Sequence, residues 1–542
     1  MKALRALENT VLHKSGAGRD RKLFRNPGIA SAVVLALMVS VSASAQIRTR
    51  AHVRTPLPSE GMAQKLPGVV TPTTAGTWTP LVNPAPENAG VMMLLSDGTV
   101  AYNGFFNNTW YRLTPDSTGG YVNGTFSTLA SMNYTRLYFQ SDLLPSGNIY
   151  VSGAEYGNPP DGGSAEMYDP LANTWTLLAD ATTVVSDINF IDGESMVLPD
   201  GNVLVYSVGG GGAFCGNGTY TTLIYQVASN TWSTPVCTIA DQDETTWVKL
   251  PDDSILALDI GTVNSERYIP SLNEWIADAS APVDLYNGNG ELGGGFLLPN
   301  GKVFYIGGTG QTAIYTPSGN TSPGTWTPGP TLPDEAGVPI GANDAPAAMM
   351  VNGNVLMTAG PYGCGYCGPT YFFVYDYRSN TLTQIDVPGG GSSLPGVSYP
   401  MYMLDLPDGS VLFSSYGSLY TFTPAGGQLK PAQYRPAIST VTKNVDGSYH
   451  VTGTGFNGIS QGACYGDEEQ NVTNYPIARL TAQNGNVYYA RTYNWSSTGV
   501  ATGSTTVTTE MTVPAGLPNG IYRLAIIANG ISSRTKAFRY KP

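Results

Sequence analysis

The chain has 542 residues, and its 39 acidic and 27 basic side chains give a formal net charge of −12. An acid excess of this size argues against nucleic acid and anionic membrane surfaces as partners. Only 12% of the residues are charged, whereas glycine (65) and tyrosine (33) are abundant, which is typical of an all-β protein with many tight turns. A chain of this length exceeds one ordinary hydrophobic core, so we expect several domains or repeats.

Residues 1–45 have the pattern of a signal peptide. Basic residues between Lys14 and Arg25 precede a short apolar run that ends in Ala43-Ser44-Ala45, as at a cleavage site. No second long apolar run follows, so the sequence predicts export without membrane insertion. Residues 46–73 are predicted to form a flexible leader. The alternatives of a periplasmic, surface-attached or released protein stay open.

A hairpin pattern then recurs seven times, each copy an apolar strand, a turn of the Pro-Asp-Gly type and a second apolar strand, as in "LDLPDGSVLFSSYG". The turn residues are Gly98, Gly147, Gly201, Asp253, Gly301, Gly353 and Gly409. Their spacing of 48 to 56 residues matches the kelch period of about 50 residues, in which one repeat is one four-stranded propeller blade.

The second half of each repeat supplies a third strand and then an outer strand that contains a tryptophan. These outer tryptophans include Trp175, Trp232, Trp275 and Trp326. The last repeat lacks such a strand, but "AGTWTPL" at residues 75–81 precedes the first hairpin and can complete the last blade. That pairing would close the ring without free edges. The sequence therefore predicts a seven-bladed kelch-type β-propeller over residues 74–430.

Residues 431–542 change to short alternating strands such as "SYHVTGTGF" and "GIYRLAIIANG", which predicts an immunoglobulin-like β-sandwich. The expected fold class is thus all-β, a propeller followed by a sandwich.

The five cysteines of an exported chain favour disulfides. We expect Cys364 and Cys367 to bridge within one hairpin, and Cys215 and Cys237 to form a second bridge within the third blade. Cys464 is left over, and we expect it to be a buried small apolar residue, with intermolecular pairing as the alternative.

The domain order resembles that of galactose oxidase and its relatives, which have a secreted seven-bladed kelch propeller followed by an early-set domain. Three stretches carry the likeness. "GPYGCGYCGPTYFFVYD" is similar to the Cys-x-x-Cys hairpin of that family, and "RLYFQSDLLPSG" places Tyr138 at the family's crosslinked copper-ligand tyrosine. "GISQGACYGDEEQNVTNYPIARL" resembles the early-set domain of bacterial relatives.

The resemblance implies a copper site with two tyrosines, two histidines and a crosslinking cysteine, but most of these ligands are missing here. The cysteine position falls on Asn88, the Tyr-His pair falls on Asn343-Asp344, and the last histidine falls near Asn474. After the predicted signal peptide the chain contains only His52 and His450. Because copper prefers imidazole, we expect the scaffold without the copper-radical oxidase.

A propeller brings the first residues of its innermost strands together around one mouth of the channel. Counting back seven or eight residues from each turn gives Asn88, Tyr138, Asp192, Asp243, Glu244, Glu291, Asn343, Asp344 and Tyr399. Four blades thus offer a carboxylate at one level. Converging oxygen ligands suit Ca²⁺, with Asp243, Glu244, Glu291 and Asp344 as the candidate ligands, or a hydroxyl-rich or cationic ligand. The alternative is that these are solvated loop residues of an acidic chain.

Three further features of the sequence contain candidate functional residues. Arg136, near Tyr138, could bind a ligand carboxylate, but pairing with the acidic mouth is the favoured interpretation. Asp467–Glu469 is either a cation site or, as we favour, a structural loop. His450 alternates within a strand, which indicates an ordinary strand residue.

Two classes of function follow. The favoured hypothesis is a binding protein that recognises an extracellular glycan or protein, because tyrosine-rich loops suit stacking and hydrogen bonding. The alternative is a carbohydrate-active enzyme, metal-dependent or oxidase-like, that uses the mouth carboxylates as acid and base or as metal ligands.

Overall fold

The computed structural model describes residues 75–159, 162–210, 214–215, 220–429, 432–465 and 470–541. The predicted signal peptide, the leader and the Asp467–Glu469 segment lie outside these residues. Within them the regular structure is β-strand, apart from two single-turn 3-10 helices, η1 (Ala181–Thr183) and η2 (Ala432–Tyr434). No helix in this part of the chain is long and apolar enough to cross a membrane.

The described strands of residues 76–424 form seven propeller blades of four main strands each, numbered from the innermost strand outward. Blade one consists of β2 (Ala89–Leu94), β3 (Val100–Gly104), β4 (Trp110–Thr114) and β5 (Thr125–Leu129). Blade two consists of β7 (Gln140–Leu143), β8 (Ile149–Ser152), β10 (Ala165–Asp169) and β11 (Thr174–Leu177). Blade three consists of β12 (Ser195–Val197), β13 (Val203–Ser207), β14 (Thr221–Gln226) and β15 (Thr231–Trp232), with β16 (Val236–Cys237) also on β14.

Blade four consists of β17 (Val248–Lys249), β18 (Ile255–Leu258), β19 (Ser265–Ile269) and β20 (Glu274–Ala277). Blade five consists of β21 (Leu292–Leu297), β22 (Val303–Gly307), β23 (Thr312–Thr316) and β24 (Thr325–Pro328). Blade six consists of β26 (Ala347–Met349), β27 (Val355–Pro361), β28 (Tyr371–Asp376) and β29 (Thr381–Ile385), with β25 (Ile340–Gly341) also on β27. Blade seven consists of β30 (Met401–Asp405), β31 (Val411–Ser415), β32 (Ser418–Pro424) and β1 (Gly76–Pro80). A small extra sheet pairs β6 (Arg136–Leu137) with β9 (Tyr156–Gly157).

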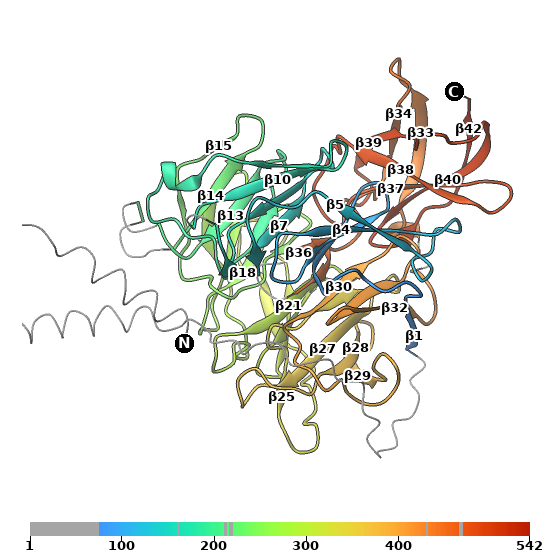
Figure 1. Ribbon diagram of the computed structural model, residues 1–542. Helices are drawn as coiled ribbons and strands as arrows, with labels where there is room; N and C mark the ends of the chain where they lie inside the picture. Colours follow the sequence, from blue (N-terminus) through green and yellow to red (C-terminus); the bar gives the residue numbers. More distant parts are fainter. Residues whose placement is uncertain are drawn as a thin grey trace, which may run out of the picture. The chain divides into compact units, whose positions relative to one another are not determined.

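The first strand closes the ring, as predicted. In Figure 1 the blue strand β1 lies beside the orange strand β32, and the two pair antiparallel from Gly76 opposite Pro424 to Pro80 opposite Tyr420. Trp78 packs against three phenylalanine rings of blades six and seven, and its indole Nε1 donates to the backbone oxygen of Asp386 at 2.8 Å. The closure therefore joins the two ends of the propeller and also locks blade seven to blade six.

The recurring turn has a local physical cause. A side-chain oxygen before each turn residue accepts a hydrogen bond from the backbone N–H two residues on, as Asp97 does from Thr99 at 3.0 Å and Asp408 does from Ser410 at 3.0 Å. The turn residue between them has a positive φ, for example 92° at Gly409. Glycine, or Asp or Asn in its place, adopts this conformation at the lowest cost, which explains the sequence repeat.

The outer tryptophans join neighbouring blades. Trp175 lies against Tyr168 of its own blade, with ring centroids 5.1 Å apart, and its Nε1 donates to the backbone oxygen of Ala130 in the preceding repeat at 3.0 Å. Trp232 makes the same bond to the backbone oxygen of Ala179 at 2.6 Å. A large apolar ring with one donor at its edge suits this position, because it fills the gap between blades and satisfies a carbonyl group there.

Eight of the described strands after residue 436 form a β-sandwich-like domain in which all strands are connected, so the predicted order of propeller and sandwich is confirmed. Its strands are β33 (Ala437–Lys443), β34 (Tyr449–Thr454), β37 (Ile477–Thr481), β38 (Val487–Tyr493), β39 (Thr506–Thr512), β40 (Gly520–Ala528), β41 (Ile531–Ser532) and β42 (Lys536–Tyr540). Alternating buried residues such as Val451, Leu480 and Met511 make its core.

One hairpin of this region leaves the sandwich. Strands β35 (Gly462–Cys464) and β36 (Gln470–Val472) extend blade six, because β35 pairs with β26. The same hairpin contacts the innermost strands β2, β7 and β30 of blades one, two and seven. Figure 1 labels β36 near β7 and β30. The hairpin therefore lies among the innermost strands, where it brings residues of the C-terminal region to the interior of the propeller.

Candidate metal centre

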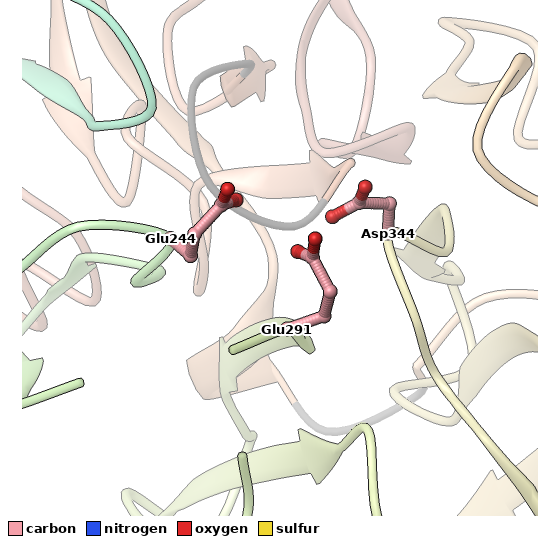
Figure 2. Close-up of side chains that lie close together, drawn as sticks. All are labelled: Glu244, Glu291 and Asp344. Carbon is pink, nitrogen blue, oxygen red and sulfur yellow. The ribbon is translucent and has the colours of Figure 1, made fainter. Parts of the chain in front are cut away.

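Three carboxylates meet at the mouth, which we define as the end of the ring where the innermost strands begin. Glu244 precedes β17, Glu291 precedes β21 and Asp344 precedes β26, so they come from three consecutive blades. One carboxylate oxygen from each lies within 4.8 Å of the others. Figure 2 shows the three groups gathered around a common point. We call these three residues the acidic cluster.

The acidic cluster is buried, which sets its electrostatics. The exposed fractions are 2% for Glu244, 0% for Glu291 and 1% for Asp344. Two unit charges about 5 Å apart repel by about 3 kcal/mol at an effective dielectric constant of about 20. Three such carboxylates are stable together when they share protons or bind a cation.

The backbone before the innermost strands repeats one unusual conformation. Tyr138, Asp192, Glu244 and Asp344 have φ values of 51°, 46°, 57° and 44°, in the left-handed region that costs a non-glycine residue about 1 kcal/mol or more. Backbone bonds hold the position in blade four, where the N–H of Glu244 donates to the backbone oxygen of Asp192 at 3.0 Å. The fold therefore fixes the direction in which these side chains leave the chain.

A disulfide loop reaches the acidic cluster. The hydroxyl of Tyr366, which lies between Cys364 and Cys367, donates to Oε1 of Glu291. The Tyr366 ring also contacts Tyr399, with centroids 5.5 Å apart and the rings almost perpendicular. Tyr366 was not among the sequence candidates, although its place between two cysteines of one hairpin is a signal that could have found it.

Three tyrosine rings, two from the innermost strands or their starts and one from the inserted hairpin, form a stack. Tyr465, which follows β35, lies between Tyr138 and Tyr402, with ring centroids 5.7 and 5.4 Å apart and interplanar angles of 19° and 21°. All three rings are buried. Tyr138 thus belongs to a stack that the inserted hairpin completes. Tyr465 was missed because strand patterns do not tell that its hairpin leaves the sandwich.

Several other sequence candidates lie outside the acidic cluster. Asp192 and Asp243 are half-buried, and Asn88 is exposed. Glu194, two residues after Asp192, is fully buried and was not predicted. The start of a strand can be predicted from sequence only to within about two residues. For this reason the buried carboxylate of blade three is that of Glu194 and not, as expected, that of Asp192.

The predicted pairing of Arg136 with the acidic mouth is wrong. Its guanidinium is buried in blade two, 3.2 Å from Oε1 of Glu166 in an ion pair, and it also donates to the Ser164 hydroxyl at 3.1 Å. Burial lowers the pKa of Arg136, and the charge of Glu166 opposes that effect. The physical reason is that Arg136 belongs to the short strand β6, whose side-chain partners Ser164 and Glu166 lie at β10 of the same repeat and not in the acidic cluster.

The cysteine predictions are confirmed. Cys215 is bonded to Cys237 and Cys364 to Cys367, with Cα–Cα distances of 5.5 and 6.2 Å. Cys464, in β35, is buried and lies outside both disulfides. His450 lies in strand β34 of the sandwich, and its Nδ1 is 2.7 Å from Oε1 of Glu510 on the neighbouring strand β39.

Comparison with known proteins gives a likeness of fold. The chain matches no protein-family model and no curated protein. A solved fungal alcohol oxidase of the AA5 family, in complex with copper, is similar with a TM-score of 0.53 and 14% identity, over 86% of this chain and 100% of that one. The extracellular domain of a hybrid two-component system from B. thetaiotaomicron has a TM-score of 0.44 and 13% identity, over 77% of this chain and 51% of that one. The chain thus has a propeller fold that resembles galactose-oxidase-like proteins.

Proposed function

We propose that the protein is an exported binding protein that holds a divalent cation at the propeller mouth and recognises an extracellular glycan or protein there, without copper-radical chemistry. The observation that carries the proposal is the acidic cluster, whose three carboxylates from consecutive blades lie within 4.8 Å of one another. Calcium takes six to eight oxygen ligands, with carboxylates prominent among them, so Ca²⁺ is the cation of choice.

The donor chemistry of the cluster does not fit copper. Its three groups are hard carboxylate oxygens, whereas copper in proteins prefers imidazole and sulfur ligands. In the part of the chain that the structure describes, the one histidine is His450, which is paired with Glu510 in the sandwich. We therefore derive no oxidase step for this protein.

Two disulfides support the export part of the proposal. Such bonds form and persist in oxidising compartments and are rare in the cytosol. The sequence pattern of residues 1–45 points the same way.

The second candidate function is a carbohydrate-active enzyme, and one distance favours it. Retaining glycosidases hold their two catalytic carboxyl groups about 5 to 5.5 Å apart. In the acidic cluster, one carboxylate oxygen of Glu244 lies within 4.8 Å of one carboxylate oxygen of Glu291. Burial argues for the binding protein instead, because a sugar would have to reach carboxylates that are at most 2% exposed. A small cation can bind among these buried carboxylates while the larger ligand contacts the exposed residues around the mouth.

The test is binding of the purified protein to arrays of extracellular glycans and proteins, in Ca²⁺ and in a calcium chelator. We expect binding in Ca²⁺ that is lost with the chelator and in Glu291→Gln. Asp243→Asn, a half-buried carboxylate outside the cluster, is the matched control and should bind normally. Binding that ignores both the chelator and Glu291→Gln would refute the role of the mouth. Shortened or oxidised glycan products would favour the enzyme.

A further inference from the structure

A groove of about 400 Å³ lies in the sandwich. None of the residues that line it belongs to the acidic cluster. The groove is formed where the chain enters β33 and where the loop after β41 leads into β42. Among the described residues it is lined by Arg435, Pro436, Ala437, Ile438, Arg534, Thr535 and Lys536. Three of these side chains are cations and none is an acid. We call this the basic groove.

The walls of the basic groove are held by a set of hydrogen bonds around Ser532. The Gln428 side chain bonds both backbone groups of Ser532, at 3.2 and 3.1 Å, and Arg435 Nε donates to the same backbone oxygen at 3.1 Å. Arg479 Nη2 donates to the Ser532 hydroxyl at 3.1 Å. The loop and the Arg435 side chain are therefore positioned before any ligand arrives, which lowers the entropy lost on binding.

The cations of the groove make no ion pair within the described chain, where no carboxylate lies within 4.0 Å of Arg435, Arg534 or Lys536. Arg435 is half-buried, and its two terminal nitrogens make no hydrogen bond to the described residues. Arg534 is exposed. A guanidinium held by one N–H with its fork available is suited to a two-point contact with a carboxylate or sulfate.

Charge is distributed very unevenly along the chain. Residues 432–541 carry nine Lys and Arg against five Asp and Glu, whereas residues 75–431 carry seven against 31. The sandwich is thus a basic region on an acidic protein, and the groove gathers three of its cations. Clustered charge of one sign attracts ligands of the opposite sign.

We infer that the basic groove binds an anionic saccharide, one that carries carboxylate or sulfate groups. Its size is within the range of about 300 to 1,000 Å³ for small-ligand sites. Ala437, which is exposed, and Ile438, which is half-buried, supply apolar surface for a sugar ring between the cations. The acidic propeller repels a membrane or a nucleic acid, whose charge density is much higher than that of a glycan with isolated acidic groups. This second site acts independently of the cation proposed at the mouth.

The test measures binding of two probes, tetragalacturonate and a sulfated galactan tetrasaccharide, to the full exported protein by calorimetry at low salt. Neutral galactotetraose is the control ligand. The groove variant is Arg435→Ala/Arg534→Ala/Lys536→Ala. The control variant, Lys443→Ala/Arg523→Ala/Arg539→Ala, removes three exposed cations of the sandwich that do not line the groove. Arg534→Glu is added because the exposed Arg534 takes part in the described hydrogen bonds only through its backbone oxygen, which accepts from the Ser533 hydroxyl at 2.8 Å, so changing its side chain leaves the groove walls intact.

We expect at least one anionic probe to bind, with an affinity that falls with added salt. The groove variant and Arg534→Glu should each lose about tenfold, about 1.4 kcal/mol, while the control variant changes less than twofold. A calcium chelator should leave this binding unchanged, which separates it from the mouth. The inference is overturned if neither anionic probe binds, if galactotetraose binds equally, or if both triple variants lose the same affinity. It is also overturned if vesicles of phosphatidylglycerol or duplex DNA bind in place of the saccharides.

Discussion

Asp405→Asn should make the protein more stable at neutral pH. Asp405 lies at the end of β30, and burial raises the pKa of its carboxyl to about 8, although the Thr473 hydroxyl opposes this with a bond of 3.4 Å from the inserted hairpin. Its Oδ1 has no hydrogen-bond partner in the described structure. The charged form is therefore disfavoured in the folded state, and an amide of the same shape removes that cost.

The sign of the pH dependence follows from proton binding. Between about pH 4 and pH 8 the folded protein keeps the proton of Asp405 and the unfolded chain releases it, so stability falls as pH rises. Each pKa unit corresponds to about 1.4 kcal/mol, so the wild type should lose about 4 kcal/mol from this group between about pH 4.5 and pH 7.5. Asp405→Asn should not show this loss.

Thermal melting of both proteins between pH 4.5 and 8 measures the effect. We expect equal melting temperatures near pH 4.5 and an advantage of about 5 °C or more for Asp405→Asn near pH 7.5. Asp446→Asn, at an exposed turn of the sandwich, is the control and should show no advantage that grows with pH. A difference between wild type and Asp405→Asn that stays constant across the range would refute the reasoning.

Substitutions at three other places test the fold. Trp78→Ala should cost about 2 to 3 kcal/mol and lower the melting temperature, because it removes the ring that joins blades six and seven; a melting curve like that of the wild type would contradict the closure. Arg136→Met should cost about 3 to 5 kcal/mol by leaving Glu166 buried and unpaired, and Arg136→Met/Glu166→Leu should recover much of it in chemical unfolding; no recovery in the double variant would contradict the pairing. Gly301→Ala should cost about 1 kcal/mol in the same assay, since φ is 79° and nothing lies within 4 Å of the new methyl group, and Gly301→Asn should cost less.

The propeller was accessible from the sequence because its signals are local and repeated. A turn that needs a positive φ marks each hairpin, and an outer strand that was missing at one end was present at the other, where Trp78 carries it. Counting back from those turns also predicted that Glu291 and its two neighbours in the acidic cluster lie at the same end of the ring.

The rest of the site depends on directions that a pattern does not encode. A left-handed residue before an innermost strand interrupts the alternation of side chains, so the partner of Arg136 was mispredicted. The hairpin that carries Tyr465 has the same strand pattern as the sandwich around it, yet its partner is β26 of blade six. Its insertion rests on contacts between segments more than one hundred residues apart, which only the folded chain reveals.

The central claim is that the acidic cluster holds a cation, and metal content by mass spectrometry tests it most directly. The exported protein is exposed to calcium, manganese and copper together, desalted thoroughly and analysed beside Glu244→Gln/Glu291→Gln/Asp344→Asn. We predict close to one equivalent of calcium per chain in the wild type and none in the triple variant. One equivalent of copper, or calcium that persists in the triple variant, would contradict the account.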